Sequence, residues 1–460
     1  MTPWPRAVNG DAGPLKAGYV PLASHFYDQD VLRGITARAE AELEGAGIQL
    51  TRTDPVVAAG DEVRALAELA SGDWDFLIAN VINWVDVRAA TRLLLALRDR
   101  PIVLYSYGGR TQDGVLVSPA AGAGSTALRY PLERWGTRFA YLFNGPDTPM
   151  DTAGVVAFGQ AARAARRLRT ARIGVIGWHD MGLYTTAVDV TQLRGTIGPE
   201  VEGIDLLQLE RAAAALSESE VAAEARRVSA HWEYPAGVPS DEVVRRCVRI
   251  YLATLALVRE HGLDAVGYKS VEGVSRWLGV THNMPSSLVA TAGVPYVDEN
   301  DILTLAAQLM LRFSSAEHVT FLEHYEHAED WALLGVDGFV PEQLIDGAPQ
   351  IKPVGNLVTG ELDGLAHCSR LRTGRLTTAT LAESDRGYRM HIAAGEAVAP
   401  PDWQELSVPG ALPSVRFVPD GGIRALLDQV LSQHCAAAFG DHAAVLRTLC
   451  DLLGVEAVVT

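Results

Sequence analysis

Three carboxylates and an amide crowd into the stretch "VPYVDENDIL", residues 294–303, between a short apolar run and a helical pattern. Asp301 directly precedes the first apolar residue of that pattern, where a carboxylate accepts backbone N–H bonds and complements the helix dipole. Asp298 is expected to be solvated. Glu299 lies before the first helical turn, at the end of the strand predicted for residues 294–297, so helix capping does not explain it.

A second acid, Glu323, ends the next apolar run and follows Glu299 by 24 residues. That spacing fits a strand end, one crossover helix and a parallel neighbouring strand, which would bring both carboxylates to the ligand-binding edge of one sheet. Two carboxylates in one cleft repel each other unless a proton or a cation lies between them. Oxygen-rich sites of this kind suit Mn²⁺ or Mg²⁺. The alternative is a pair of solvated, helix-capping acids.

A candidate for a third ligand stands near the end of the chain. His434 opens a run of small residues, 434–439, that is predicted to be a strand and follows a helical segment. Imidazole is a common metal ligand, but a single histidine in such a position is also often satisfied within a core. Both roles remain open for His434 on this evidence.

Apolar residues alternate between short runs and longer helical stretches up to about residue 345, which is typical of parallel sheets covered by helices. Beyond it, short segments rich in Thr, Gly and Pro indicate antiparallel strands. We therefore expect an α/β fold of three domains. These are an N-terminal α/β domain (1–168), a second α/β domain that carries the acidic site (169–345), and a β-rich C-terminal domain (346–460) with a mixed α/β tail.

The composition argues against several classes of partner. The 460-residue chain has a formal net charge of −17, which disfavours nucleic acid and anionic membrane surfaces. No apolar run approaches the roughly 20 residues that a membrane helix needs. The four cysteines are widely spaced, and the first residues lack the order of a secretory signal, so we expect a cytoplasmic protein.

Polar and aromatic residues follow several other predicted strands, where they are candidates for contacts with a sugar or with groups around the metal. Ordinary loop residues are the alternative for most of them, and a structural ion pair is the alternative for the last two. The candidates are Asn83, Trp84 and Arg110 in the first domain, His179, Met181 and Tyr184 after residues 172–178, and Lys269 and Glu272 after residues 264–270.

Residues 265–311 resemble the second domain of the L-fucose isomerase and L-arabinose isomerase superfamily. In that family a lysine-containing strand precedes a G-x-P-x-x-x-E-x-D motif that opens a helix, and this chain has "GVPYVDEND" at 293–301. The likeness extends through "VTFLEHYEH" (319–327), and it includes residues 172–206 and the "QHCAAAFGDH" tail from Gln433. It is weak over the first 150 residues.

The resemblance implies two Rossmann-like, doubly wound α/β domains followed by a β-rich domain, usually as a homo-oligomer, a hexamer or trimer. It implies an aldose–ketose isomerase of a small sugar that works through a cis-enediol with Mn²⁺ or another divalent cation such as Mg²⁺ or Co²⁺. Glu299 and Glu323 would bind the metal and form the acid/base pair, with His434 as the third ligand. Asp301 and Glu272 would support the metal site from an outer layer.

Departures from the family pattern bear on the substrate. Asp337 stands where relatives carry a histidine in an L-G-x-H segment, so it could contact the substrate or bind the metal. Gln433 replaces one of two adjacent histidines, and "YKS" keeps Lys269 without a neighbouring thiol. Two alternatives stay open: a related metal-dependent enediol enzyme, such as an epimerase or a biosynthetic isomerase of a modified sugar, and a noncatalytic sugar-binding protein.

Overall fold

The computed structural model describes residues 13–460 apart from 71, 357, 359, 361–363 and 401–410. The chain forms two compact units, residues 12–166 and 167–460, termed the N-terminal unit and the C-terminal unit. In the described parts of both units, no helix combines the length and the apolar character needed to cross a membrane.

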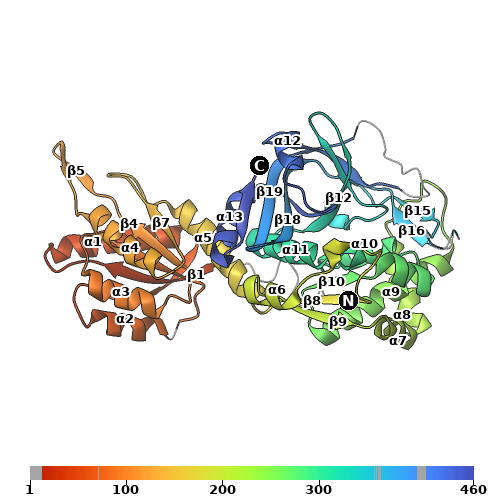
Figure 1. Ribbon diagram of the computed structural model, residues 1–460, viewed down its shortest axis with the longest axis horizontal. Coiled ribbons are helices and arrows are strands. Elements are labelled where there is room, and N and C mark those ends of the chain that lie inside the picture. The colour runs from red at the N-terminus through yellow and green to blue at the C-terminus, as the bar shows by residue number, and fades with distance from the viewer. Residues whose placement is uncertain (1–12, 71, 357, 359, 361–363, 401–410) are drawn as a thin grey trace. The chain divides into compact units, whose positions relative to one another are not determined.

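The N-terminal unit is built on a parallel sheet with the strand order β2-β1-β3-β4-β7 (Figure 1). Its strands are β1 (Leu15–Leu22), β2 (Ile48–Arg52), β3 (Phe76–Val81), β4 (Ile102–Ser106) and β7 (Phe139–Phe143), and its helices are α1 (Gln29–Gly45), α2 (Asp61–Ala70), α3 (Val87–Ala96), α4 (Ala121–Arg134) and α5 (Thr152–Leu168). Helices α2, α3 and α4 share one apolar core with the sheet, while α1 packs through Leu32 in a separate cluster. A short hairpin of β5 (Arg110–Gln112) and β6 (Val115–Val117) follows β4.

The C-terminal unit begins with a second parallel sheet, ordered β11-β10-β8-β9 (Figure 1). Its strands are β8 (Arg172–Ile176), β9 (Glu200–Ile204), β10 (Ala265–Tyr268) and β11 (Tyr296–Val297), and its helices are α6 (Val190–Thr196), α7 (Leu206–Ala215), α8 (Glu218–Ser229), α9 (Asp241–His261), α10 (Asn283–Thr291) and α11 (Ile302–Ser315). Oxygen-bearing side chains cap the starts of several helices: Asp189 for α6, Asp205 for α7, Ser217 for α8 and Ser240 for α9. Such caps satisfy N–H groups that have no partner within the helix.

The rest of this unit is dominated by an antiparallel sheet in the order β18-β21-β12-β13-β20-β19-β22. Because β18 also pairs with β19, the sheet closes into a barrel and leaves few free edges. Its strands are β12 (Thr320–His327), β13 (Ala332–Gly335), β18 (Gly374–Ser384), β19 (Gly387–Val398), β20 (Ser414–Pro419), β21 (His434–Phe439) and β22 (Glu456–Val459). Two small ribbons, β14 (Ile345–Asp346) with β17 (Arg370–Leu371) and β15 (Ile351–Val354) with β16 (Gly364–His367), and helices α12 (Ile423–Leu427) and α13 (Ala443–Leu453) complete the unit.

One topological expectation is wrong: β12 is not a parallel neighbour of β11 but a strand of the antiparallel barrel. The reason lies in α11, whose residues are buried on every side, so it is not a helix with one wet face. It packs against β8 and β10 of the parallel sheet and against β18 and β21 of the barrel. Because α11 lies between the two sheets, the strand that follows it, β12, joins the barrel and not the parallel sheet. Strands before and after position 345 therefore belong to the same barrel sheet.

His367 at the end of β16 provides a test of this packing through pH. Burial lowers the pKa of its imidazole to about 3, and its backbone N–H donates to the carbonyl of Gly338 in the loop after β13. Because an unfolded histidine titrates near 6.5, the unfolded chain binds more protons than the folded chain between about pH 6.5 and 3. Stability is therefore lost as the pH falls through that window. Between pH 7 and pH 4.5, we expect the free energy of unfolding of His367→Asn to fall by about 2 kcal/mol less than that of the parent protein, as measured by urea unfolding. Parallel losses in the two proteins would contradict the expectation.

Candidate active site

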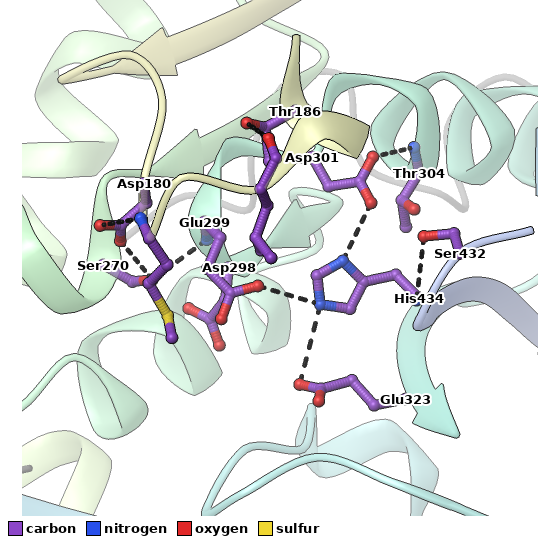
Figure 2. Close-up of polar contacts among 12 residues, drawn as sticks. Asp180, Thr186, Ser270, Asp298, Glu299, Asp301, Thr304, Glu323, Ser432 and His434 are labelled. Carbon is purple, nitrogen blue, oxygen red and sulfur yellow. Dashed lines mark hydrogen bonds and ion pairs between the residues drawn. The ribbon is translucent and has the colours of Figure 1, made fainter. Parts of the chain in front are cut away.

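Three side chains from separate elements of the C-terminal unit converge on one point (Figure 2). The Nε2 atom of His434 lies 3.2 Å from Oε2 of Glu299 and 3.8 Å from Oε1 of Glu323. Glu323 on β12 is the direct cross-strand partner of His434 on β21, while Glu299 lies in the turn after β11. The two glutamates thus meet as expected, although they come from different sheets.

His434 is fully buried, and one carboxylate fixes its orientation. Its Nδ1 lies 2.9 Å from Oδ2 of Asp301, whose other oxygen accepts the N–H of Thr304 at 3.0 Å and caps α11. A carboxylate can only accept, so the proton of a neutral imidazole resides on Nδ1. The Nε2 atom has no partner in hydrogen-bond geometry among the described residues, and it faces the carboxylates of the two glutamates. Asp301 therefore acts both as helix cap and as the group that positions His434.

The electrostatics of this cluster favour a positive charge at its centre. Burial lowers the pKa of His434, but the carboxylates of Asp301, Glu299 and Glu323 together hold it well above its ordinary value. In the absence of a cation, a proton on the imidazole offsets the repulsion among the carboxylates. A bound cation would serve the same purpose and displace that proton.

Glu299 reaches the cluster from an unusual backbone conformation. Both Glu299 and Asn300 have φ of +57°, a left-handed region that costs energy for residues other than glycine. The turn is held by its neighbours: the N–H of Glu299 donates to Ser270 Oγ at 3.0 Å, and Nδ2 of Asn300 donates to the carbonyl of Ile176 at 2.9 Å. Strain that the surroundings fix in this way commonly marks a functional position.

Asp180 holds the segment of residues 270–272, which contacts this turn, and nothing in its sequence context predicts that role. Its buried carboxylate accepts the N–H groups of Val271 at 2.7 Å and Glu272 at 3.0 Å. It also accepts the hydroxyl of Ser270 at 3.4 Å (Figure 2). Since Ser270 also receives the N–H of Glu299, Asp180 supports Glu299 through one intermediate. The only sequence signal was its place just after the strand predicted for residues 172–178.

Gly267 on β10 offers a test of how tightly this turn is packed. A Cβ there would lie 2.7 Å from Oδ1 of Asn300, whose side chain is held by the hydrogen bond from its Nδ2 to the carbonyl of Ile176. We expect Gly267→Ala to cost about 1–3 kcal/mol of stability, because overpacking must shift the turn, and to lower turnover with it. Gly203→Ala on β9 of the same sheet meets no atom within 4 Å and is the matched control. Equal thermal and kinetic behaviour of the two variants would contradict the expectation.

Two further carboxyl groups, those of Asp298 and Asp337, share the electrostatic environment of this site. Asp298 is not solvated as expected: it is 4% exposed, is hydrogen-bonded by the hydroxyl of Tyr296, and lies 3.8 Å from Nε2 of His282. Burial raises its pKa. Burial also raises the pKa of Asp337 to about 6, and its Oδ1 has no hydrogen-bond partner among the described residues. The negative charges of Asp298 and Glu323 contribute to the raised pKa of Asp337, which places that carboxyl in the same electrostatic environment.

The other candidate residues lie in three places. Lys269 and Glu272 form an ion pair at 3.3 Å, the structural alternative that the sequence left open. His179 contacts Thr186 Oγ1 at 3.1 Å, while the side chains of Met181 and Tyr184 are exposed, that of Tyr184 to 94%. Trp84 belongs to the N-terminal unit, just after β3, and is partly exposed.

This chain is similar to sulfoquinovose isomerases. It is 22% identical over 398 residues to the sulfoquinovose isomerase of Alkalicoccus urumqiensis, covering 83% of this chain and 86% of the relative. Sulfoquinovose isomerases of Priestia aryabhattai and Priestia megaterium are each 20% identical over 386 residues, covering 83% of this chain and 85% of the relative. No protein-family model matches the sequence. The likeness, which spans most of each protein, supports the prediction of an isomerase enzyme.

The trio of Glu299, Glu323 and His434 is a suitable donor set for a divalent cation. It offers carboxylate oxygens and one imidazole nitrogen, and Asp301 holds the far side of the ring as outer carboxylates do in histidine–metal sites. The buried, unpartnered Nε2 is the atom that such an ion would satisfy. Among the described residues, no group of three His, Cys, Asp or Glu side chains is already arranged to hold a metal ion.

Proposed function

We propose that this protein is a metal-dependent aldose–ketose isomerase that acts on a small sugar or sugar derivative through a cis-enediol. The observation that carries the proposal is the buried His434, held by Asp301 at Nδ1 and facing Glu299 and Glu323 with an unpartnered Nε2. A purely structural histidine would have both nitrogens satisfied. The likeness to sulfoquinovose isomerases over 83% of the chain supports the same class of reaction.

Isomerisation of an open-chain aldose requires two proton movements. One proton leaves C2 and is returned to C1, and another leaves the hydroxyl at C2 and reaches the oxygen at C1. Glu299 and Glu323 provide two carboxylates at one point, so one can carry the carbon-bound proton while the other carries the oxygen-bound proton. The burial of this point in the C-terminal unit limits the access of water and preserves the enediol from side reactions.

Glu299, Glu323 and His434 would hold the cation. When bound, a divalent ion polarises the carbonyl and hydroxyl oxygens of the sugar and so makes the C2 proton easier to remove. The outer residues keep the donors in place: Asp301 orients the imidazole, and Ser270 with Asp180 fixes the strained turn of Glu299. Mn²⁺ is the ion we propose, with Mg²⁺ or Co²⁺ as substitutes, because oxygen ligands with one imidazole suit it.

Sulfoquinovose, a sugar sulfonate, is the first substrate to examine, because it is the sugar that the names of the relatives contain. Asp337, with an unpartnered oxygen beside the acidic group, is the residue of this unit that we propose contacts the substrate. At neutral pH its raised pKa leaves a fraction of the carboxyl protonated, so it can donate a hydrogen bond to a sugar hydroxyl as well as accept one.

The test is to incubate the Mn²⁺-loaded protein in D₂O with sulfoquinovose and with a panel of aldoses and ketoses, and to follow the sugars by NMR. We expect conversion of one sugar to its ketose with deuterium at C1 or C2, and none after chelation until Mn²⁺ is restored. Binding of a sugar without conversion or exchange across the whole panel would favour the noncatalytic alternative. Exchange at C2 that returns an aldose epimer would favour an epimerase.

A further inference from the structure

The N-terminal unit contains a cavity of about 890 Å³, a volume within the range of small-molecule sites. Its walls come from α1 and from the segments that follow β3, β4 and β7, including Asn83, Tyr107 and Asn144. These segments all leave the sheet at the carboxyl ends of parallel strands, which is the edge where open α/β sheets bind ligands. Arg110 and Val117 of the β5–β6 hairpin complete one side.

One polar group in this wall lacks a partner. Asn83 is fully buried, and its Oδ1 accepts the N–H of Ser24 at 2.9 Å, which fixes the orientation of the amide. Its Nδ2 has no hydrogen-bond partner among the described residues. By contrast, Asn144 uses both ends of its amide within the protein, on Gly108, Gly145 and Thr148. A buried donor left unsatisfied costs stability, so an acceptor on a ligand would repay it.

The charged groups of the cavity divide by sign. Three of the carboxylates accept backbone N–H groups: Asp28 from Asp30 at 2.8 Å, Glu42 from Met150 at 2.6 Å, and Asp147 from Thr111 at 2.9 Å. The fourth, Asp30, forms an ion pair with Arg33. The two cations, Arg38 and Arg110, take part in no ion pair within the described residues. Arg38 is hydrogen-bonded to the hydroxyl of Tyr107, and Arg110 donates to the amide oxygen of Gln112 at 3.2 Å, so each guanidinium keeps further donors. The groups that remain available are therefore donors, which suit an anionic ligand rich in acceptors.

The loops argue against a nucleotide in this place. Nucleotide sites on such sheets use glycines between the first strand and its helix, so that phosphate approaches the helix N-terminus. Here "ASHFYDQD", residues 23–30, contains no glycine, and the carboxylate of Asp28 already caps α1. Hydroxyl and amide groups beside the tyrosine rings of Tyr27 and Tyr107 suit a sugar instead.

We propose that the N-terminal unit binds a small sugar-like anion in this cavity, with the anionic group at Arg38 and Arg110 and a sugar oxygen on Nδ2 of Asn83. The anion can be a carboxylate, a phosphate or a sulfonate, since all three share the acceptor geometry that guanidinium recognises. The proposal needs no residue of the C-terminal unit and does not depend on the isomerase reaction.

The experiment is calorimetric titration of the full chain carrying Glu299→Gln, so that no probe is converted. The probes are glucuronate, glucose 6-phosphate and sulfoquinovose, with glucose as the uncharged match and inorganic sulfate as the bare anion. We expect at least one sugar anion to bind about tenfold or more tightly than glucose and sulfate, and to bind more weakly as salt is raised. The three anionic probes also show which acidic group is preferred.

Variants then locate the binding. Arg38→Gln and Arg110→Gln should each weaken the sugar anion about tenfold or more, and Asn83→Asp, which keeps the acceptor for Ser24, should do the same. Arg98→Gln, an exposed residue after α3 that does not belong to the cavity wall, is the control and should bind as the parent does. Unchanged affinity in both arginine variants would overturn the proposal, as would equal binding of glucose or of sulfate. Arg38 and Arg110 are exposed, so their replacement should not disturb the fold. The test therefore stands even if Asn83→Asp does not fold.

Discussion

Glu299→Gln and Glu323→Gln should each lower kcat by about 10²–10⁴-fold, the usual contribution of a positioned acid or base. The amide has nearly the same shape as the carboxylate, but it can neither carry the proton of the sugar nor offer the charge that a divalent cation needs. Both side chains face Nε2 of His434, so either change also removes one of the carboxylates that raise the pKa of that imidazole. The expected result is an inactive enzyme that keeps its fold.

Three measurements separate this outcome from simple unfolding. Glu326→Gln, an exposed residue on the same strand as Glu323, is the matched control and should retain both activity and thermal stability. Calorimetric titration with Mn²⁺ should give weaker binding for Glu299→Gln and Glu323→Gln than for the parent and for Glu326→Gln. Thermal melting without metal should be unchanged or slightly higher for the two site variants, because each removes one of several crowded carboxylates. Parent-like turnover in Glu299→Gln would rule out the proposed chemistry.

The residues of the central trio could be selected from the sequence, although one step of the reasoning was wrong. Glu299 stood out because helix capping explained Asp301 and left Glu299 without a role. The spacing predicts that Glu323 lies on a parallel strand beside β11, whereas it lies on the barrel strand β12. The two still meet because β12, in the next layer, runs back along α11 and contacts β11, where the turn of Glu299 begins.

The supporting groups could not be predicted because their partners are distant in sequence. Asp180 acts on backbone N–H groups some 90 positions later, and His282 approaches Asp298 from the segment before α10. Sequence patterns report the periodicity of one element at a time, and they carry no signal for which loops meet. The pairing of β12 with β21 in the barrel, which sets Glu323 beside His434, is equally non-local, whereas the alternation that predicted parallel sheets is local.

Asp301→Asn should separate the two roles of Asp301 and is the sharpest test of the site. Asparagine keeps an oxygen for the N–H of Thr304, so the cap of α11 and the stability should change by only a few tenths of a kcal/mol. Its amide nitrogen, however, cannot accept the Nδ1 proton of His434. The imidazole must then turn or carry its proton on Nε2, where that proton faces Glu299 and Glu323 and blocks a cation.

We therefore expect Asp301→Asn to weaken Mn²⁺ binding and to lower activity by about 10–100-fold, and to lower the pKa of His434 measured by NMR in the metal-free protein. The pKa should fall because the hydrogen bond with Asp301 is the largest of the contacts that raise it. Asp205→Asn, at the equivalent cap of α7, is the matched control and should change neither quantity, since its carboxylate contacts only a backbone N–H. Asp301→Ala removes the cap as well, so it should lower the free energy of unfolding by about 1 kcal/mol more than Asp301→Asn does. If Asp301→Asn bound Mn²⁺ as the parent does, the imidazole would not need this carboxylate, and His434 would not be a ligand oriented by Asp301.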